Sequence, residues 1–178
     1  MYSTTSWPTL ATALERAEMG DGSVMLRISD PFRGRKPNGS YSNQQDAYTA
    51  NTCLDFPAPR DTATYTAWAA ALKEDAPHFA QQVAYNDLAC AFWPVPPERT
   101  PGPVRAAGAP PIVVVGSTFD PATPYAWARA LAAQLESGTL ITRSGDGHTG
   151  YISSHCVEEA VDAYLLELRI PDRDLTCY

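Results

Sequence analysis

The feature that most constrains the fold is a succession of β and α patterns after residue 111. Residues 112–115 are four consecutive β-branched apolar residues, which is typical of a parallel strand buried on both faces. We expect a loop over residues 116–123 and then a helix from Pro124 toward Gly138, because Thr123 can cap a helix and proline suits its first position. Apolar residues recur on this helix every four positions, at Trp127, Leu131 and Leu135.

The same alternation continues to the end of the chain. Residues 139–142 are predicted to form a second strand, residues 143–154 a glycine-containing loop, and residues 155–169 a last helix that ends before Pro171. The predicted fold class is therefore α/β with parallel strands. A parallel sheet needs more than two strands and helices on both faces. We therefore expect these residues to be the last β-α-β-α part of a larger sheet, with an exposed apolar edge.

The residues before this succession are mainly helical in pattern. A proline-rich stretch from Pro94 to Pro111 separates the helical pattern from the alternating β and α pattern. So many prolines exclude a helix or a central strand in this stretch. The sequence thus predicts a helical region over residues 1–105 and an α/β region over residues 106–178. Helices are expected at 7–19, between 61 and 77, and at 79–90, a polar loop at 30–50, and either a strand or a helix at 24–28.

The charge balance argues against two classes of partner. The chain has 13 Lys and Arg residues against 20 Asp and Glu residues, a net charge of −7, and a pI of about 4.8. Such a chain has no positive field for nucleic acid or an anionic membrane. No apolar run approaches the roughly 18 residues that a membrane-spanning helix needs, and the first residues lack the pattern of a signal peptide.

Four cysteines point to an oxidising compartment. Three pairings of Cys53, Cys90, Cys156 and Cys177 are possible, and none of these residues has the Cys-x-x-Cys spacing of a metal site. Sequential pairing is the simplest: one bridge would hold the carboxyl-terminal tail to the last helix, and the other would flank the helices of residues 61–89. We favour disulfides over the alternative of four buried free thiols. Free thiols would not indicate whether the protein works in an oxidising or a reducing compartment.

Two loops carry candidate catalytic side chains. Asp120 follows the first predicted strand and His148 follows the second, 28 positions later. Because neighbouring parallel strands end at the same edge of a sheet, these loops are expected to meet. A carboxylate beside an imidazole fixes the ring's tautomer and stabilises its protonated form, as a general base requires. Asp146 is expected to shape the turn, and His78 and His155 to be structural.

No cofactor is expected, and a metal site is the weakest alternative. It would use Asp146, His148 and His155, whose uneven spacing is poor evidence for metal ligation. We therefore do not expect a metal ion at these residues.

Residues 111–177 resemble the carboxy-terminal part of the tripeptidyl-aminopeptidase-like (TAP-like) α/β-hydrolases, secreted bacterial exopeptidases related to proline iminopeptidases. The resemblance rests on Asp-Pro-x-Thr-Pro at 120–124, Gly-His-x-Gly at 147–150, and the paired Cys156 and Cys177. Upstream, shorter motifs such as Cys90-x-x-Trp-Pro show a weaker similarity to the sequence of that family's helical cap. The resemblance implies a cap over residues 1–105, Asp120 as triad acid, His148 as triad base, a peptide or small ester substrate, and export.

The serine nucleophile of such a triad is not found. Hydrolases of this fold place it before the acid in a Gly-x-Ser-x-Gly turn, and the sequence has no such motif. The serines near the candidate pair fit loop or capping positions better: Ser117, Ser144, Ser153 and Ser154. We expect the carboxy-terminal portion of an aminopeptidase-type serine hydrolase, inactive alone, whose serine and signal peptide lie upstream of Met1. The alternative is a non-catalytic binding or complementing module that docks another chain through the cap or the sheet edge.

Overall fold

The structure is a computed structural model that describes residues 2–178. The chain divides into two compact units. The α/β unit combines Met1–Met25 with Pro103–Tyr178, and the helical unit is Leu26–Gly102. Residues 2–25 thus group with the α/β unit.

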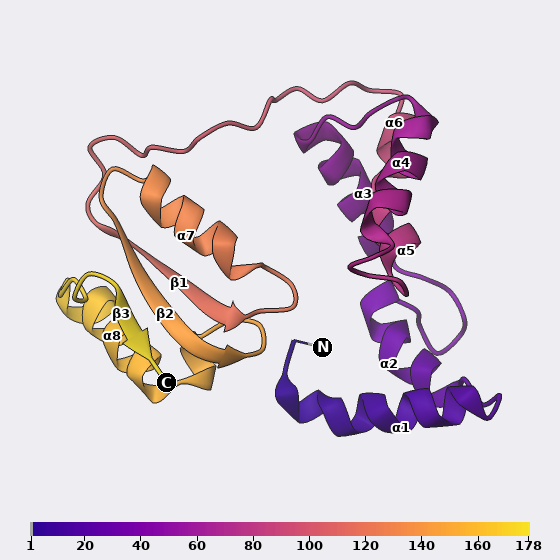
Figure 1. Cartoon of the computed structure of the whole chain (residues 1–178), viewed down its shortest axis with the longest axis horizontal. Coiled ribbons are helices and arrows are strands. Elements are labelled where there is room, and N and C mark those ends of the chain that lie inside the picture. Colours follow the sequence, from indigo (N-terminus) through magenta and orange to yellow (C-terminus); the bar gives the residue numbers. More distant parts are fainter. Residues whose placement is uncertain (1) are drawn as a thin grey trace. The chain divides into compact units, whose positions relative to one another are not determined.

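The α/β unit is built on three parallel strands, so the predicted α/β class is confirmed. They are β1 (Ile112–Phe119), β2 (Gly138–Asp146) and β3 (Leu175–Cys177), in the spatial order β1-β2-β3 (Figure 1). Val115 is opposite Ile141 in the β1–β2 register. β3 was not predicted from the sequence, because a three-residue strand with the polar residue Thr176 at its centre has no apolar pattern.

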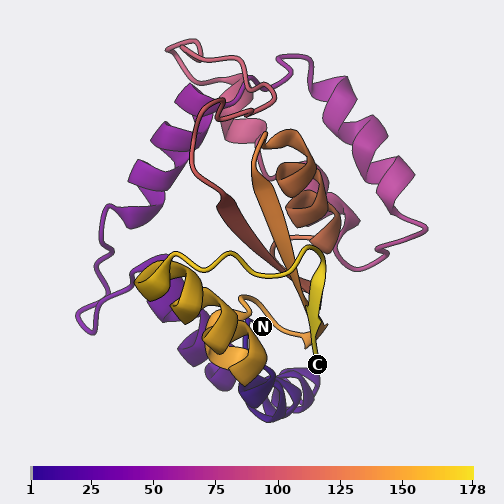
Figure 2. The same cartoon turned by 90° about the vertical axis from the view of Figure 1, so that its left-hand side faces the viewer.

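Two helices cover opposite faces of this sheet. Successive side chains of a strand point to opposite faces. Val115 packs against the core cluster that contains Val157 of α8 (His155–Glu167). A Cβ atom added at the next residue, Gly116, would lie 2.6 Å from the Cβ atom of Ala128 in α7 (Tyr125–Gln134). The two figures show α7 and α8 on different sides of the strands (Figures 1 and 2).

Both main strands are longer than predicted. The expected loops at 116–123 and 143–154 begin too early, since β1 reaches Phe119 and β2 reaches Asp146. The parallel register continues through Ser117 opposite Arg143, and then shifts before Phe119 meets Asp146. Gly116 and the polar residues that follow interrupt the apolar pattern, so the sequence suggests that the strand ends there. The backbone hydrogen bonds to β2 do not depend on apolar side chains and continue past this point.

The predicted Cys156–Cys177 disulfide is present, and the tail that it holds to α8 is the strand β3. Ile141, Val157 and Cys177 are almost fully buried and form the centre of the core. The predicted helix limits differ slightly from those observed at both helices: α8 ends at Glu167, where Leu168 adopts a left-handed conformation, two residues before the predicted end at Arg169. Similarly, α7 begins at Tyr125, so that Pro124 and not Thr123 is its N-cap residue.

The remaining helices precede the proline-rich stretch. In chain order they are η1 (Thr4–Ser6), α1 (Trp7–Glu18), α2 (Ser23–Arg33), α3 (Gln44–Asp55), α4 (Thr62–Leu72), α5 (Ala80–Ala84) and α6 (Leu88–Ala91). A second short 3₁₀ helix, η2 (Tyr151–Ser153), precedes α8. No helix in the part of the chain described here is long and apolar enough to cross a bilayer.

The predicted polar loop over residues 30–50 was wrong. α2 settles the open choice at residues 24–28 as helix and extends to Arg33, and α3 begins at Gln44. α3 is mostly polar and has no apolar face, so it could not be predicted from the periodicity of apolar residues. Its one buried residue, Cys53, is bridged to Cys90 of α6, which confirms the predicted pairing and explains how a polar helix is held.

Candidate active site

Asp120 is held at the end of β1 by its own loop. Its side chain is only 5% exposed. Oδ1 accepts hydrogen bonds from the backbone N–H groups of Ala122 (2.8 Å) and Thr123 (2.9 Å), and Oδ2 accepts one from the Thr123 hydroxyl (3.0 Å). An aspartate that accepts bonds from residues two and three positions later closes a local turn, so the sequence Asp-Pro-x-Thr orients this carboxylate before any distant contact forms.

His148 lies two residues beyond the end of β2, on a loop fixed by three backbone contacts. Its N–H donates to the Tyr2 carbonyl (2.8 Å), and the Arg143 guanidinium donates to the Asp146 carbonyl (2.6 Å). The Gly145 N–H donates to the Thr118 hydroxyl (2.9 Å). Between these anchors the backbone passes through Gly147 at φ 105°, a conformation that glycine adopts readily and other residues avoid.

The structure brings the two predicted side chains together. His148 Nδ1 lies 2.9 Å from Asp120 Oδ2 and 3.1 Å from Oδ1. The pairing of Phe119 with Asp146 places the two strand ends side by side, as expected from the sequence. Because an ionised carboxylate only accepts hydrogen bonds, Nδ1 carries the proton, and Nε2 of the neutral ring is left to accept one.

The hydrogen bonds of this site keep Asp120 ionised. Burial acts to raise its pKa, but the N–H groups of Thr123 and Ala122, followed by the His148 and Thr123 side chains, outweigh burial. Together they lower the pKa from 3.8 to about 2. A carboxylate at this position is therefore charged throughout the range in which a histidine titrates.

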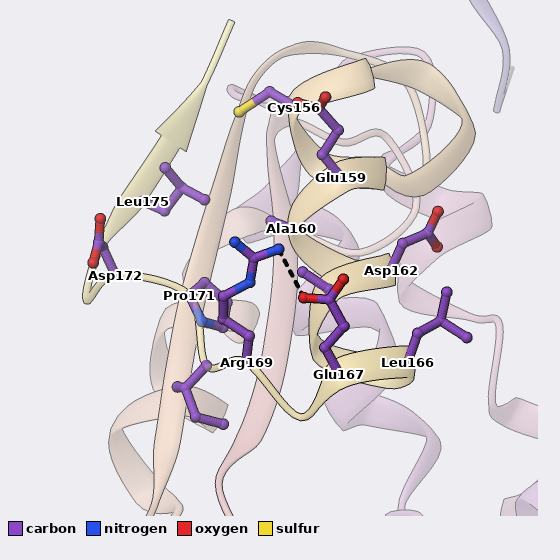
Figure 3. A pocket seen from close by; sticks show the side chains of 12 residues that line it. Cys156, Glu159, Ala160, Asp162, Leu166, Glu167, Arg169, Pro171, Asp172 and Leu175 are labelled. Carbon is purple, nitrogen blue, oxygen red and sulfur yellow. Dashed lines mark ion pairs between the residues drawn. The ribbon is translucent and has the colours of Figure 1, made fainter.

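A cavity of about 250 Å³ adjoins the pair. Its lining includes the strand residues Val115 and Ser117 and the loop residues Thr149 and Gly150, besides Asp120 and His148. A larger groove of about 810 Å³ lies along α8 and the segment that leads to β3 (Figure 3). Acidic residues predominate among the charged groups of that groove, and its Arg169 is ion-paired with Glu167 at 3.0 Å. This groove contains neither Asp120 nor His148, whereas the smaller cavity contains both. The smaller cavity is therefore the candidate active site.

In the part of the chain that the structure describes, the pair has no side-chain hydrogen bond to the other candidates of the sequence, namely the serines, Asp146 and His155, although Ser117 lines the same cavity. Among the residues described, no serine hydroxyl hydrogen-bonds to the His148 imidazole, and no three His, Cys, Asp or Glu side chains gather as a metal site would need. Asp146 contributes its carbonyl to Arg143. The His155 side chain is 82% exposed, near Glu158 and Glu159.

Three contributors to the site were missed from the sequence. Thr123 was interpreted as a helix cap, although its place three residues after an aspartate is also a turn pattern that could have revealed it. Arg143 had no distinguishing pattern. Tyr2 contacts His148 through its carbonyl and through its ring, with centroids 4.9 Å apart. No local pattern could predict that contact, because it joins residues 146 positions apart.

Comparisons with known proteins identify relatives of this chain. A family model described as "TAP-like protein" matches residues 76–177. Carboxylesterase B of Mycobacterium tuberculosis is 39% identical over 183 residues, which cover 99% of this chain and 35% of the relative. Serine protease Hip1 of the same organism is 35% identical, with 99% and 35% covered.

A third relative is named as an aminopeptidase. Tripeptidyl aminopeptidase of Streptomyces lividans is 32% identical over 180 residues, which cover 99% of this chain and 33% of that protein. The chain therefore spans about a third of the length of these relatives. Since the family model matches more than half of the 178 residues, the chain belongs to the TAP-like family of α/β-hydrolases and has the fold of the carboxy-terminal part of an α/β-hydrolase.

Proposed function

We propose that Asp120 and His148 are the acid and the base of a Ser-His-Asp triad in a serine hydrolase. The observation that carries the proposal is the 2.9 Å contact between Asp120 Oδ2 and His148 Nδ1. It leaves Nε2 of the neutral ring as a proton acceptor, which is the atom that faces the nucleophile in such a triad.

The reaction follows from this geometry. Nε2 takes the proton of a serine hydroxyl as its oxygen attacks the substrate carbonyl, and Asp120 stabilises the imidazolium that forms. Nε2 then gives the proton to the leaving amine or alcohol, which leaves an acyl-enzyme. In the second half, Nε2 takes a proton from water as the water oxygen attacks the acyl carbonyl. Nε2 then returns this proton to the serine oxygen as the acyl bond breaks, which releases the acid and regenerates the serine.

The nucleophile, in this proposal, comes from a part of the hydrolase outside these 178 residues. Two observations support this. The sequence has no Gly-x-Ser-x-Gly turn. The chain also matches about a third of the length of its relatives.

The substrate class is a peptide or an ester. The relatives are named a carboxylesterase, a serine protease and a tripeptidyl aminopeptidase, and one acyl-transfer mechanism serves both bonds. Of these, we favour removal of residues from the amino termini of peptides, in agreement with the TAP-like family match.

The helical region suggests how the chain is divided, and the cysteines suggest the compartment in which it works. We infer that residues 1–105 act as the helical cap region, although residues 2–25 group with the α/β unit, and that residues 106–178 are part of the catalytic domain. Both disulfides favour an oxidising, extracytoplasmic compartment, since such bridges are rare where thiols are kept reduced.

The test uses a chimera in which this chain replaces the matching third of the Streptomyces lividans relative. Hydrolysis of a tripeptide p-nitroanilide with a free amino terminus, its N-acetylated form and a p-nitrophenyl ester would be measured. We expect Asp120→Asn and His148→Gln to lower kcat by roughly 10³- to 10⁴-fold. His155→Gln, which changes an exposed histidine of the same unit, is the matched control and should leave kcat unchanged.

Several outcomes would contradict the proposal. Full activity of the His148→Gln chimera would remove His148 as the base. Hydrolysis by the 178-residue chain alone, with fluorophosphonate labelling at one of its own serines, would show that the nucleophile is present after all. A preference for the acetylated peptide or for the ester would reject the aminopeptidase assignment and leave the triad intact.

A complementing module is the second candidate, and the edge of β1 favours it. Within the described residues β1 pairs only with β2, so its other edge offers backbone groups to a further strand. In this reading the chain docks through that edge without catalysis. Binding to such a partner that persists after Asp120→Ala and His148→Ala, together with no loss of hydrolysis in the chimera, would favour it.

A further inference from the structure

Thr123 contacts both members of the candidate pair. Its hydroxyl donates to Asp120 Oδ2 at 3.0 Å, and its backbone N–H donates to Oδ1 of the same carboxylate at 2.9 Å. The same hydroxyl oxygen lies 3.4 Å from His148 Nδ1. One residue therefore holds both carboxylate oxygens and also stands beside the ring nitrogen that they face.

We propose that Thr123 is a positioning residue, whose hydroxyl fixes the rotation of the Asp120 carboxylate so that Oδ2 stays directed at His148 Nδ1 through the reaction. The inference rests on the proposed function, because it gives Thr123 its role in holding the triad base through Asp120.

The bonding pattern explains why this hydroxyl matters. Oδ1 is held by two backbone N–H groups, but in the described structure Oδ2 is held only by Thr123 and His148. The last torsion of an aspartate side chain has a broad energy minimum, so a carboxylate anchored on one side can turn. When the imidazole moves during proton transfer, the Thr123 hydroxyl is the donor that keeps Oδ2 in place.

The obvious alternative is that Thr123 caps α7, and the structure does not support it. The N-cap residue of α7 is Pro124, and the Trp127 N–H donates to the Pro124 carbonyl. The Thr123 hydroxyl is instead directed at Asp120. Its contribution is therefore to the carboxylate and not to the start of the helix.

The test compares three variants of the 178-residue chain by NMR. Thr123→Val removes the hydroxyl and keeps the branched shape, and Thr123→Ser keeps the hydroxyl. Thr142→Val is the matched control: it removes a buried threonine hydroxyl from the same unit, but one bonded to the Tyr125 hydroxyl at 2.6 Å. Amide spectra verify that each variant is folded, and titration data are used only where that spectrum is retained.

Two readouts separate positioning from general stability. The first is the ¹⁵N shift pattern of the neutral His148 ring, which reports whether Nδ1 carries the proton. We expect the Nδ1–H form in the wild type, in Thr123→Ser and in Thr142→Val, and a mixture of tautomers in Thr123→Val. The second is the carboxyl ¹³C resonance of Asp120, which should titrate roughly one pH unit higher in Thr123→Val alone.

An unchanged tautomer and an unchanged Asp120 titration in folded Thr123→Val would overturn the inference, as would a serine variant that behaves like the valine variant. Neither result depends on hydrolysis. A failure here would leave the triad proposal to its own activity test, and an inactive chimera would leave this test valid. In the chimera, Thr123→Val should lower kcat by about tenfold and leave KM unchanged, since the hydroxyl acts on the base and not on the substrate.

Discussion

At the scale of the residue, the ionised state of Asp120 links the candidate site to stability. Its pKa is lowered from 3.8 to about 2 in the folded chain, against the effect of burial, mainly by the N–H groups of Thr123 and Ala122 and by His148. A lowered carboxyl pKa contributes stability that is present above the unfolded value and is lost as the pH falls through the folded value. The contribution should thus disappear between about pH 4 and pH 2.

Asp120→Asn tests this link. At pH 5 we expect the variant to be less stable than the wild type by about 2 kcal/mol, and the difference to shrink toward pH 2. Urea unfolding followed by tryptophan fluorescence at several pH values measures it. Asp172→Asn, which changes an exposed aspartate of the same unit, is the control and should give a small difference at every pH. A constant gap for Asp120→Asn would contradict the assignment.

The pair itself could be predicted from the sequence, but the contacts that hold it could not. Asp120 and His148 follow strands whose apolar residues are visible, and adjacent strand ends bring them together. Thr123 has two possible roles, capping a helix or closing the aspartate turn, and only the positions of Oδ2 and of Pro124 decide between them. The Tyr2 carbonyl depends on the tertiary fold alone, because any residue has one.

At the scale of the element, long apolar strands and amphipathic helices were predicted, and short or polar elements were not. Val113, Val115 and Ile141 mark β1 and β2 directly. By contrast, β3 has three residues and is held by pairing to β2 and by the bond from Cys177 to α8. α3 likewise depends on the Cys53–Cys90 bridge. Covalent and pairing constraints from distant residues replace the local pattern in these elements.

The Cys156–Cys177 bridge is therefore expected to decide whether β3 stays docked. Replacement of both cysteines by alanine should cost roughly 3 kcal/mol, because the bond closes a loop of 21 residues. Hydrogen exchange should show lost protection at β3 first. Replacing Cys53 and Cys90 by alanine is the matched control and should lower protection at α3 and α6 instead. Full protection of β3 without its bridge would show that strand pairing alone suffices.

At the scale of the whole molecule, the α/β unit has a three-stranded sheet whose β1 edge is unpaired in the described residues. The Ile112 N–H donates to the Ser137 carbonyl beside β2. Because successive N–H groups of a strand point to alternate sides within the sheet, those of Val113, Val115 and Ser117 point to the free edge. The sequence predicted this edge from the shortage of strands, whereas the direction of each N–H required the structure.

Hydrogen exchange at β1 tests whether the free edge receives a further strand of the hydrolase. In the isolated chain at low concentration, we expect the N–H groups of Val113 and Val115 to exchange rapidly, and those of Val114 and Gly116, which face β2, to be protected. In the chimera all four should be protected, because a neighbouring strand then accepts the outward hydrogen bonds. The inward N–H groups are the internal control, since their pairing to β2 is the same in both proteins. Rapid exchange of Val113 and Val115 in an active chimera would show that catalysis does not need a strand at this edge, and would leave the chain's contribution to the hydrolase confined to its two loops.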